Sequence, residues 1–269
     1  MINRVCRCVE IPITDEEKVY IHCNVVIEEK IQRMFPNGKM IRMVPDISIE
    51  FINGEYVFES VYKDVGGVEK NLYDIMFVIE ELIQKKYSYL VLHGGAIAKE
   101  NEAIAFIQAR KAGKSTLIRG VLSNKQYSYV SDDLLLMSEN KIAGVGLPIR
   151  VRDKLEGVIS SEGTYIDRYV DEAGEIRNIY VPNSIYSIGF KKVSAMVIPF
   201  YGAEFDNSIR LINGIEKIIR VINNVKEYRS VSFLYDELIR ICNGISIYEI
   251  RYSNIEFVQQ VLSGLWRDG

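Results

Sequence analysis

The sequence has no uninterrupted apolar run long enough to cross a bilayer, which takes about 20 residues. Its first residues, from Met1 to Val5, also lack the apolar core of a signal peptide. We therefore expect a cytoplasmic protein with no membrane partner. A basic excess is missing too, because the formal net charge is -3 and the lysines and arginines are scattered along the chain. This charge balance argues against a general nucleic-acid-binding protein.

Cys-x-x-Cys spacing, which is typical of zinc sites, is absent from the four cysteines, which are Cys6, Cys8, Cys23 and Cys242. Cys6 and Cys8 alternate within an apolar run that predicts a strand, so both thiols would lie on one face of it. Zinc held with His22 and Cys23 is the alternative to buried strand thiols. We favour buried thiols, because cysteine is among the most buried residue types and stays free in a reducing compartment.

Apolar residues make up 48% of the chain, which is enough for a core in one large α/β domain or in a core domain with an appendage. Residues 1–65 predict a β-rich region, interpreted as a meandering antiparallel sheet, with Asn53-Gly54 as its hairpin signal. From residue 66 the apolar period becomes helical, between Leu72 and Ile83. We assign residues 66–269 to one catalytic domain.

The last third of the chain is predicted to contain both helices and a strand. Apolar spacing predicts one helix from Ile215 to Val225 and a second from Val231 to Ile241. A strand is expected from Ile245 to Tyr252, and a capping box then opens a terminal helix at Ser253–Glu256. These elements complete an α/β fold.

A phosphate-binding loop is the clearest functional signal. The apolar strand Ala103–Ile107 runs into a loop that ends in Gly113-Lys114-Ser115-Thr116 and opens a helix. Backbone N–H groups at the positive end of that helix can bind a phosphate, and Lys114 can bridge the β- and γ-phosphates of ATP. The Ser115 hydroxyl can ligate Mg²⁺. The residues assigned to nucleotide binding are Arg110, Lys111, Ala112, Gly113, Lys114, Ser115 and Thr116.

Gln108 stands where this motif usually has its first glycine. Glycine is favoured there because the turn can demand a positive φ. Gln108 is compatible with the motif if its backbone stays extended. The alternative reading of the whole segment is a chance Gly-Lys-Ser-Thr at the start of a surface helix.

Two adjacent carboxylates, Asp132 and Asp133, follow the strand Tyr127–Val130. Such a pair is costly to bury unless a cation needs it, and Mg²⁺ held by ATP and Ser115 would be that cation. One carboxylate would lie near the metal and the other would accept the proton of an attacking hydroxyl. A solvated turn in which an aspartate caps the next element is the alternative.

Three further residues are candidates for substrate contacts. His93, which precedes Gly94-Gly95, is interpreted either as a contact of phosphate or acceptor, or as a structural residue of a glycine turn. Arg150 and Arg152 share one side of a short strand, and guanidinium groups suit phosphate or carboxylate geometry. Ordinary surface charges are the alternative for both arginines.

With these residues identified, the chain resembles the catalytic domain of HPr serine kinase/phosphorylase. The resemblance is carried by three segments, which are Leu92–Ala98, Ala105–Leu117 and Tyr129–Leu134. It implies a P-loop core of the HPr kinase and PEP carboxykinase type, with Lys114 and Ser115 serving ATP and Mg²⁺. It also implies that Asp132 or Asp133 is the base toward a serine hydroxyl and that His93 is the family's active-site histidine.

The resemblance is closer to the smaller HPr-kinase-like proteins of peptide-modification pathways, including those for lasso peptides. The resemblance implies an ATP-dependent serine kinase whose acceptor partner is a peptide or protein, and a homo-oligomer, since the family is hexameric. Two alternatives stay open. One is a kinase of a small molecule such as free serine, and the other is a nucleotide-binding scaffold without turnover.

Overall fold

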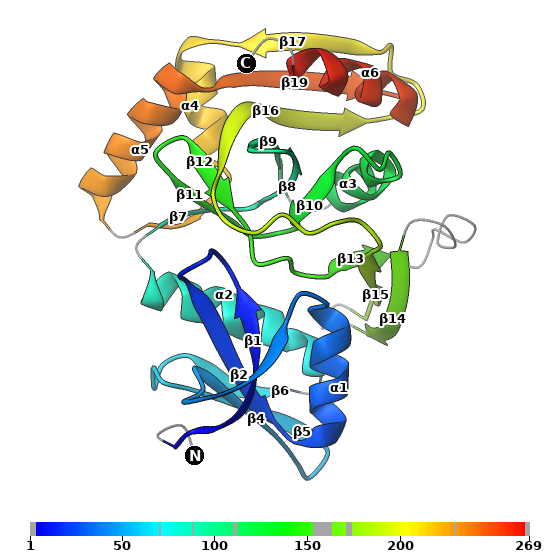
Figure 1. The fold of residues 1–269 in the computed structure, drawn as a ribbon. Coiled ribbons are helices and arrows are strands. Elements are labelled where there is room, and N and C mark those ends of the chain that lie inside the picture. Colours follow the sequence, from blue (N-terminus) through cyan, green and yellow to red (C-terminus); the bar gives the residue numbers. More distant parts are fainter. Residues whose placement is uncertain are drawn as a thin grey trace.

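The computed structural model describes residues 4–69, 71–87, 89–109, 112–152, 163–170, 174–228 and 230–266. It is a mixed α/β fold in two stacked parts, with the N-terminal part at the bottom of Figure 1. None of the helices in these ranges is both long and apolar enough to span a membrane.

The N-terminal part is a six-stranded sheet in the order β3-β1-β2-β4-β5-β6. Its strands are β1 (Cys6–Pro12), β2 (Lys18–Cys23), β3 (Lys39–Met43), β4 (Ile47–Ile52), β5 (Glu55–Ser60) and β6 (Gly66–Glu69). Strands β4 and β5 form the expected hairpin, because Asn53 and Gly54 both adopt positive φ, 52° and 89°. The predicted boundary at residue 65 falls between β5 and β6, which pair with each other in this sheet.

The expected antiparallel meander is corrected at one point, where helix α1 (Val25–Met34) interrupts it. The Asn24 side chain caps this helix by accepting a hydrogen bond from the Ile27 N–H at 3.0 Å. Ile27, Ile31 and Met34 then bury one face of the helix. Because α1 carries the chain back across the sheet, β2 and β4 pair in parallel, and the sheet is mixed.

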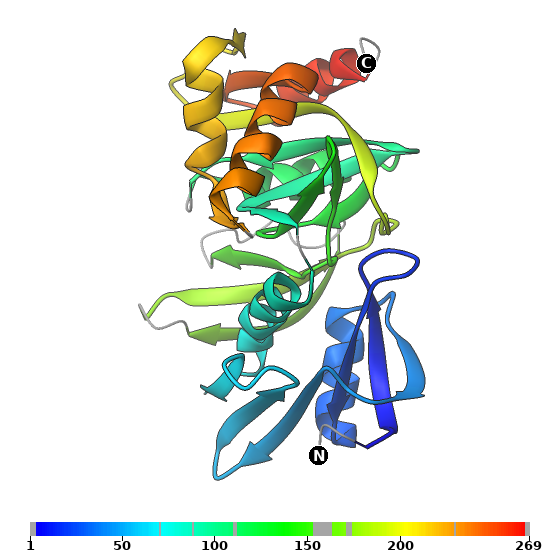
Figure 2. The same cartoon turned by 90° about the vertical axis from the view of Figure 1, so that its left-hand side faces the viewer.

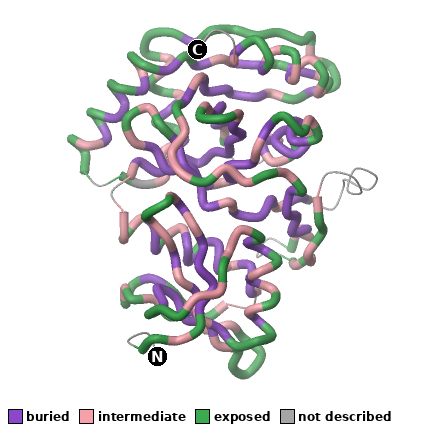
Figure 3. Tube along the Cα trace, in the orientation of Figure 1, coloured by how far each residue is buried: buried purple, intermediate pink, exposed green. Residues whose placement is uncertain are grey.

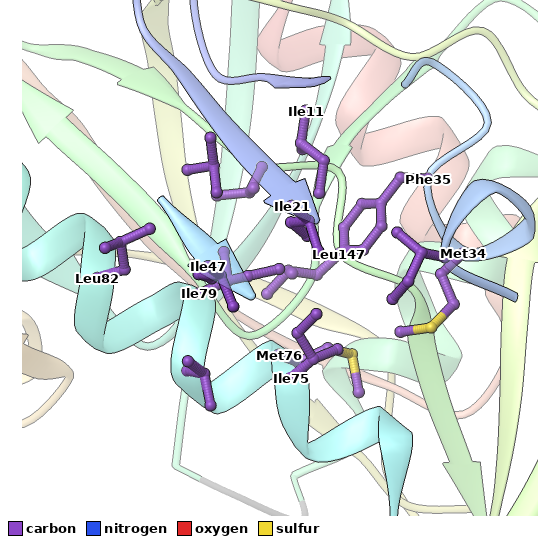
Figure 4. Packing of buried hydrophobic residues seen from close by; sticks show 14 of the residues in the cluster. Ile11, Ile21, Met34, Phe35, Ile47, Ile75, Met76, Ile79, Leu82 and Leu147 are labelled. Carbon is purple, nitrogen blue, oxygen red and sulfur yellow. The ribbon is translucent and has the colours of Figure 1, made fainter. Parts of the chain in front are cut away.

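Helix α2 (Ile75–Lys86) joins the two parts and follows a 3₁₀ turn at Leu72–Asp74, as the helical period predicted. Figure 4 shows Ile75, Met76, Ile79 and Leu82 of this helix facing Ile21 and Ile47 of the N-terminal sheet. The same core cluster includes Leu134, Leu136 and Leu147 from the C-terminal part. One hydrophobic core is therefore continuous from the N-terminal sheet to the strand after the aspartate pair.

The C-terminal part contains a ten-stranded sheet, and β9 is buried within it from Ala103 to Ile107. Its strands are β7 (Leu90–Leu92), β8 (Gly94–Lys99), β9 (Glu102–Ile107), β10 (Ser128–Ser131), β11 (Leu135–Ser138), β12 (Lys141–Ala143), β16 (Lys191–Tyr201), β17 (Ser208–Ile212), β18 (Val225–Glu227) and β19 (Ser246–Tyr252). Alternate residues of β9 enter two different core clusters, Ile104 and Phe106 on one face and Ala103, Ala105 and Ile107 on the other. Burial on both faces explains the uninterrupted apolar run of this strand.

Helices cover both faces of that sheet (Figure 2). They are α3 (Lys114–Leu122) and α6 (Ile255–Leu265) on one face, and α4 (Gly214–Ile222) and α5 (Val231–Gly244) on the other. The cap of α6 is Asn254, which accepts from the Phe257 N–H at 2.9 Å, one residue after the predicted Ser253. Val225 was expected in a helix but begins β18, because α4 ends at Ile222.

A three-stranded sheet lies between the two larger ones in Figure 1. Its strands are β13 (Ile149–Arg152), β14 (Gly163–Val170) and β15 (Ile176–Pro182). Figure 3 shows that buried residues run through the interior of both parts, while α4 and α5 present much exposed surface.

Candidate nucleotide-binding site

The predicted phosphate loop connects the end of β9 to the start of α3, as the motif requires. Helix α3 begins at Lys114, and Gly113 is its N-cap with φ 84°. The first-turn N–H groups of a helix have no intrahelical acceptor and form an anion-binding end. Within the motif, Ser115 is half-buried and Thr116 is exposed, whereas Arg110 and Lys111 lie outside the described residues.

Gly113→Ala is expected to destabilise the protein by about 1–2 kcal/mol, because a left-handed backbone is unfavourable for a residue with a Cβ. No described heavy atom lies within 4 Å of a Cβ built on Gly113. The loss of stability in this variant would therefore come from the backbone conformation and not from a steric clash. Gly264→Ala is the matched control, since that exposed glycine within α6 is also uncrowded and has no positive φ. Thermal melting should show a loss for the first variant and no loss for the second; equal effects would contradict the role of φ.

Gln108 does not adopt a positive φ, so its position does not demand glycine. Its main-chain carbonyl instead accepts a hydrogen bond from Lys114 Nζ at 2.6 Å. The departure from the usual motif is therefore compatible with the backbone of this loop.

Lys114 is buried, with 5% of its surface exposed. Besides Gln108, its Nζ contacts the Ala109 carbonyl at 3.2 Å and His93 Nε2 at 3.0 Å. An ammonium group only donates hydrogen bonds, so His93 Nε2 is the acceptor and the ring proton is on Nδ1. The lysine is thus directed into the loop, next to the N-terminus of α3.

His93 occupies the corner between β7 and β8. Its backbone N–H donates to the Asn224 carbonyl at 2.7 Å, just before β18. Its Nδ1 lies 3.9 Å from Asp133 Oδ1. His93 therefore lies between Lys114 on one side and Asp133 on the other.

Asp132 follows β10 and is 1% exposed. Neither of its carboxylate oxygens has a hydrogen-bond partner among the described residues. Burial, followed by the charge of Asp133, raises the pKa of Asp132 to about 7, against the lowering effects of Ser115, Lys114 and Arg150. A buried carboxylate beside a serine hydroxyl, whose oxygens have no hydrogen-bond partner in the described part of the chain, has the chemistry of a cation ligand.

Asp133 has a left-handed backbone, with φ 67°, and its side chain is 24% exposed. Its Oδ2 pairs with Arg150 Nη2 at 2.5 Å. Burial alone would raise the pKa of Asp133, but the Arg150 guanidinium lowers it to about 2. Two adjacent aspartates therefore occupy different environments: Asp133 is ionised and paired with Arg150, whereas Asp132 is buried and has no hydrogen-bond partner among the residues that the structure describes.

Arg150 lies in β13 and is held between Asp133 and the Phe77 ring, whose centroid is 5.0 Å from the guanidinium carbon. Arg152 lies two residues further along the same strand, opposite Arg177, and its side chain is outside the described part of the structure. Of the two predicted substrate arginines, the structure brings Arg150 to the site through Asp133.

Several contributors were not predicted from sequence. Phe77 and Glu80 come from α2, and Lys226 of β18 pairs with Glu80 at 2.6 Å. Gly95 lets β8 pass close to α3 and to Asp132, because a Cβ there would lie 2.2 Å from Ile118 Cδ1 and 3.1 Å from Asp132 Oδ1. The Gly94-Gly95 pair was the available signal for this approach, whereas Lys226 gave none.

The zinc alternative at the N-terminal cysteines gains no support. Across the described residues, no group of three or more His, Cys, Asp or Glu side chains could hold a metal ion. The Cys6 and Cys8 sulfurs are 3.8 Å apart on one strand, as the alternation predicted, and His22 Nδ1 contacts the Arg7 carbonyl. All four cysteines are free, and burial raises the pKa of Cys8 and of Cys23 to about 12.

No known family model matches the chain, and no curated protein matches it. Among solved structures, the chain is similar to the HPr(Ser) kinase/phosphatase from Coxiella burnetii, matched over 66% of this chain and 94% of that chain. The two sequences are 12% identical over the match, and the TM-score is 0.30.

Proposed function

We propose that this protein is an ATP-dependent kinase that transfers the γ-phosphoryl group to a serine hydroxyl of a peptide or protein. The observation that carries the proposal is the buried Asp132 carboxylate, whose oxygens have no hydrogen-bond partner among the described residues, beside Lys114 and Ser115. A nucleotide with Mg²⁺ would supply the missing positive charge there. The resemblance of Leu92–Ala98 and Tyr129–Leu134 to segments of the HPr kinase family supports the same reaction class.

The first turn of α3 would bind the phosphates. Its N–H groups would contact the β-phosphate, and Lys114 would turn from the Gln108 carbonyl to the β- and γ-phosphates. Ser115 and Asp132 would hold Mg²⁺, an ion that prefers oxygen ligands. When bound, the metal neutralises charge that develops on the phosphates during transfer.

Asp133 would orient the acceptor hydroxyl. It is ionised, because Arg150 lowers its pKa to about 2, and it is the more exposed carboxylate of the pair. Such a carboxylate is a weak base, but phosphoryl transfer depends mainly on positioning. The serine oxygen bonds to the γ-phosphorus as the bond from that phosphorus to the β,γ-bridging oxygen breaks. ADP leaves, and the hydroxyl proton passes by way of Asp133 to water.

Calorimetric titration with ATP and Mg²⁺, followed by incubation with ³²P-labelled ATP, tests the proposal. We expect nucleotide binding and a phosphate adduct on serine-containing peptides in mass spectrometry. Free serine in a parallel incubation separates the peptide acceptor from the small-molecule alternative. Binding without turnover would support the scaffold alternative, and absence of nucleotide binding would refute the proposed function.

A further inference from the structure

Helix α2 presents one aromatic ring toward solvent at the candidate site. Its apolar residues Ile75, Met76, Val78, Ile79, Leu82 and Ile83 are all buried in the core. Phe77, in contrast, is 39% exposed. The helical spacing therefore places Phe77 on the face of α2 that points away from the N-terminal sheet.

The Phe77 ring is linked to Asp133 through Arg150, which contacts both groups. Its centroid lies 5.0 Å from the Arg150 guanidinium carbon, and that guanidinium contacts Asp133 Oδ2 at 2.5 Å. The side chains of Arg150 and Asp133 are 21% and 24% exposed. All three groups are thus partly accessible, and a molecule that contacts Asp133 from the Arg150 side also meets the ring.

The nucleotide side of the site is separate from this surface. Lys114 reaches His93 Nε2, whereas Asp133 faces His93 Nδ1, so the imidazole stands between the lysine and the carboxylate. A nucleotide on the first turn of α3 would approach from the lysine side. The surface formed by Phe77 and Arg150 therefore remains available to the phosphoryl acceptor.

Two ion pairs border this surface. Arg150 is neutralised by Asp133, and Lys226 by Glu80, which lies three residues after Phe77 on α2. Each pair cancels its own charge, so neither pair attracts an acidic or a basic side chain strongly. An aromatic ring among paired charges favours contact with an apolar or aromatic group.

We propose that Phe77, Arg150 and Asp133 form the acceptor subsite, in which the Phe77 ring contacts an apolar or aromatic side chain adjacent to the phosphorylated serine. This inference rests on the proposed kinase function. It makes Phe77 a specificity residue, which selects the peptide and takes no part in the bonds that form and break.

The test compares three synthetic peptides of the form acetyl-Gly-Xaa-Ser-Xaa-Gly-amide, with phenylalanine, aspartate or lysine at both Xaa positions. For the wild type we expect the highest kcat/KM with the phenylalanine peptide. Phe77→Ala should raise KM for that peptide about tenfold, equivalent to about 1.4 kcal/mol, with kcat and ATP affinity unchanged. The conservative Phe77→Leu should retain most of the preference. Phe51→Ala is the matched control, since Phe51 is an exposed phenylalanine on β4.

The outcomes separate the two proposals. If the wild type does not bind ATP, the proposed function itself fails. If it binds and consumes ATP but shows no preference among the peptides, phosphorylates none of them, or responds equally to the Phe77 and Phe51 changes, the acceptor subsite is refuted and the nucleotide site stands. Melting curves of each variant confirm that the comparison is made on folded protein.

Discussion

Asp132→Asn is expected to abolish phosphoryl transfer and, at the same time, to stabilise the protein without ligands at about pH 8. The loss of activity follows because the proposed Mg²⁺ ligand disappears, and we expect kcat to fall by at least about 100-fold. The gain in stability follows because the asparagine side chain would carry no charge in a site where neither oxygen of Asp132 finds a hydrogen-bond partner among the described residues.

The pH dependence gives this prediction its sign. The pKa of Asp132 is raised in the folded state to about 7, above its unfolded value of about 3.9. As pH rises between these values, the unfolded chain releases a proton that the folded chain keeps, so the folded state loses stability. The free energy of unfolding is lower by on the order of 2–4 kcal/mol above the folded pKa. An asparagine at this position does not titrate, so the variant does not lose this stability. The melting temperature of Asp132→Asn should exceed that of the wild type by about 5 °C or more at pH ~8 and by less at pH ~5.

Asp133→Asn is the matched control with the opposite sign. The pKa of Asp133 is depressed to about 2 by Arg150, so its charge stabilises the fold above the unfolded pKa and this stability is lost as pH falls. Removing the charge leaves Arg150 without its partner carboxylate, and the melting temperature at pH ~8 should fall. Should both variants melt below the wild type at that pH, the assignment of Asp132 as an uncompensated buried charge would be wrong.

Lys114→Met is expected to lower kcat/KM by about 100- to 1000-fold, the range for loss of a preorganised charge at a developing anion. The methionine keeps the length of the side chain but cannot donate to a phosphate. It also leaves His93 Nε2 and the Gln108 carbonyl without their donor, so a modest loss of stability should accompany the loss of activity. Titration calorimetry with ADP and Mg²⁺, together with turnover of labelled ATP, measures both binding and transfer.

Lys125→Met provides the control for this variant. Lys125 is an exposed lysine that follows α3 and lies outside the predicted phosphate loop. We expect nucleotide affinity and turnover within about twofold of the wild type, consistent with a surface substitution. Equal losses in both variants would contradict a specific role for the Lys114 charge.

Local sequence patterns predicted the part of the fold that surrounds the loop. The apolar run of β9, the turn to Lys114 and the strand before Asp132 could be placed because each has a strong period or a turn residue of its own. Helix α1 was missed because Val25 and Val26 extend the β-branched run of β2, although both valines are exposed in the structure. Its Asn24 cap and the spacing of Ile27, Ile31 and Met34 were the signals that identify it.

At the candidate site, too, sequence patterns identified some residues and missed others. The sequence singled out Lys114, Ser115, the aspartate pair, His93 and Arg150, and the structure brings these residues together, while their roles stay predictions. Phe77 and Lys226 could not be found in this way, because both reach the site through packing between elements distant in sequence. The different environments of Asp132 and Asp133 were also hidden, since burial and the Arg150 pairing depend on tertiary structure.

The core that joins α2 to Leu134 and Leu136 determines whether a fragment of the protein can fold by itself. A fragment that begins after α2 would leave the apolar residues behind Asp132 and Asp133 without their packing partners and facing water. The N-terminal sheet is in this sense a scaffold for the phosphate-binding half. Denaturation of the whole chain should proceed as one cooperative transition, and separate expression of the C-terminal half should yield insoluble material.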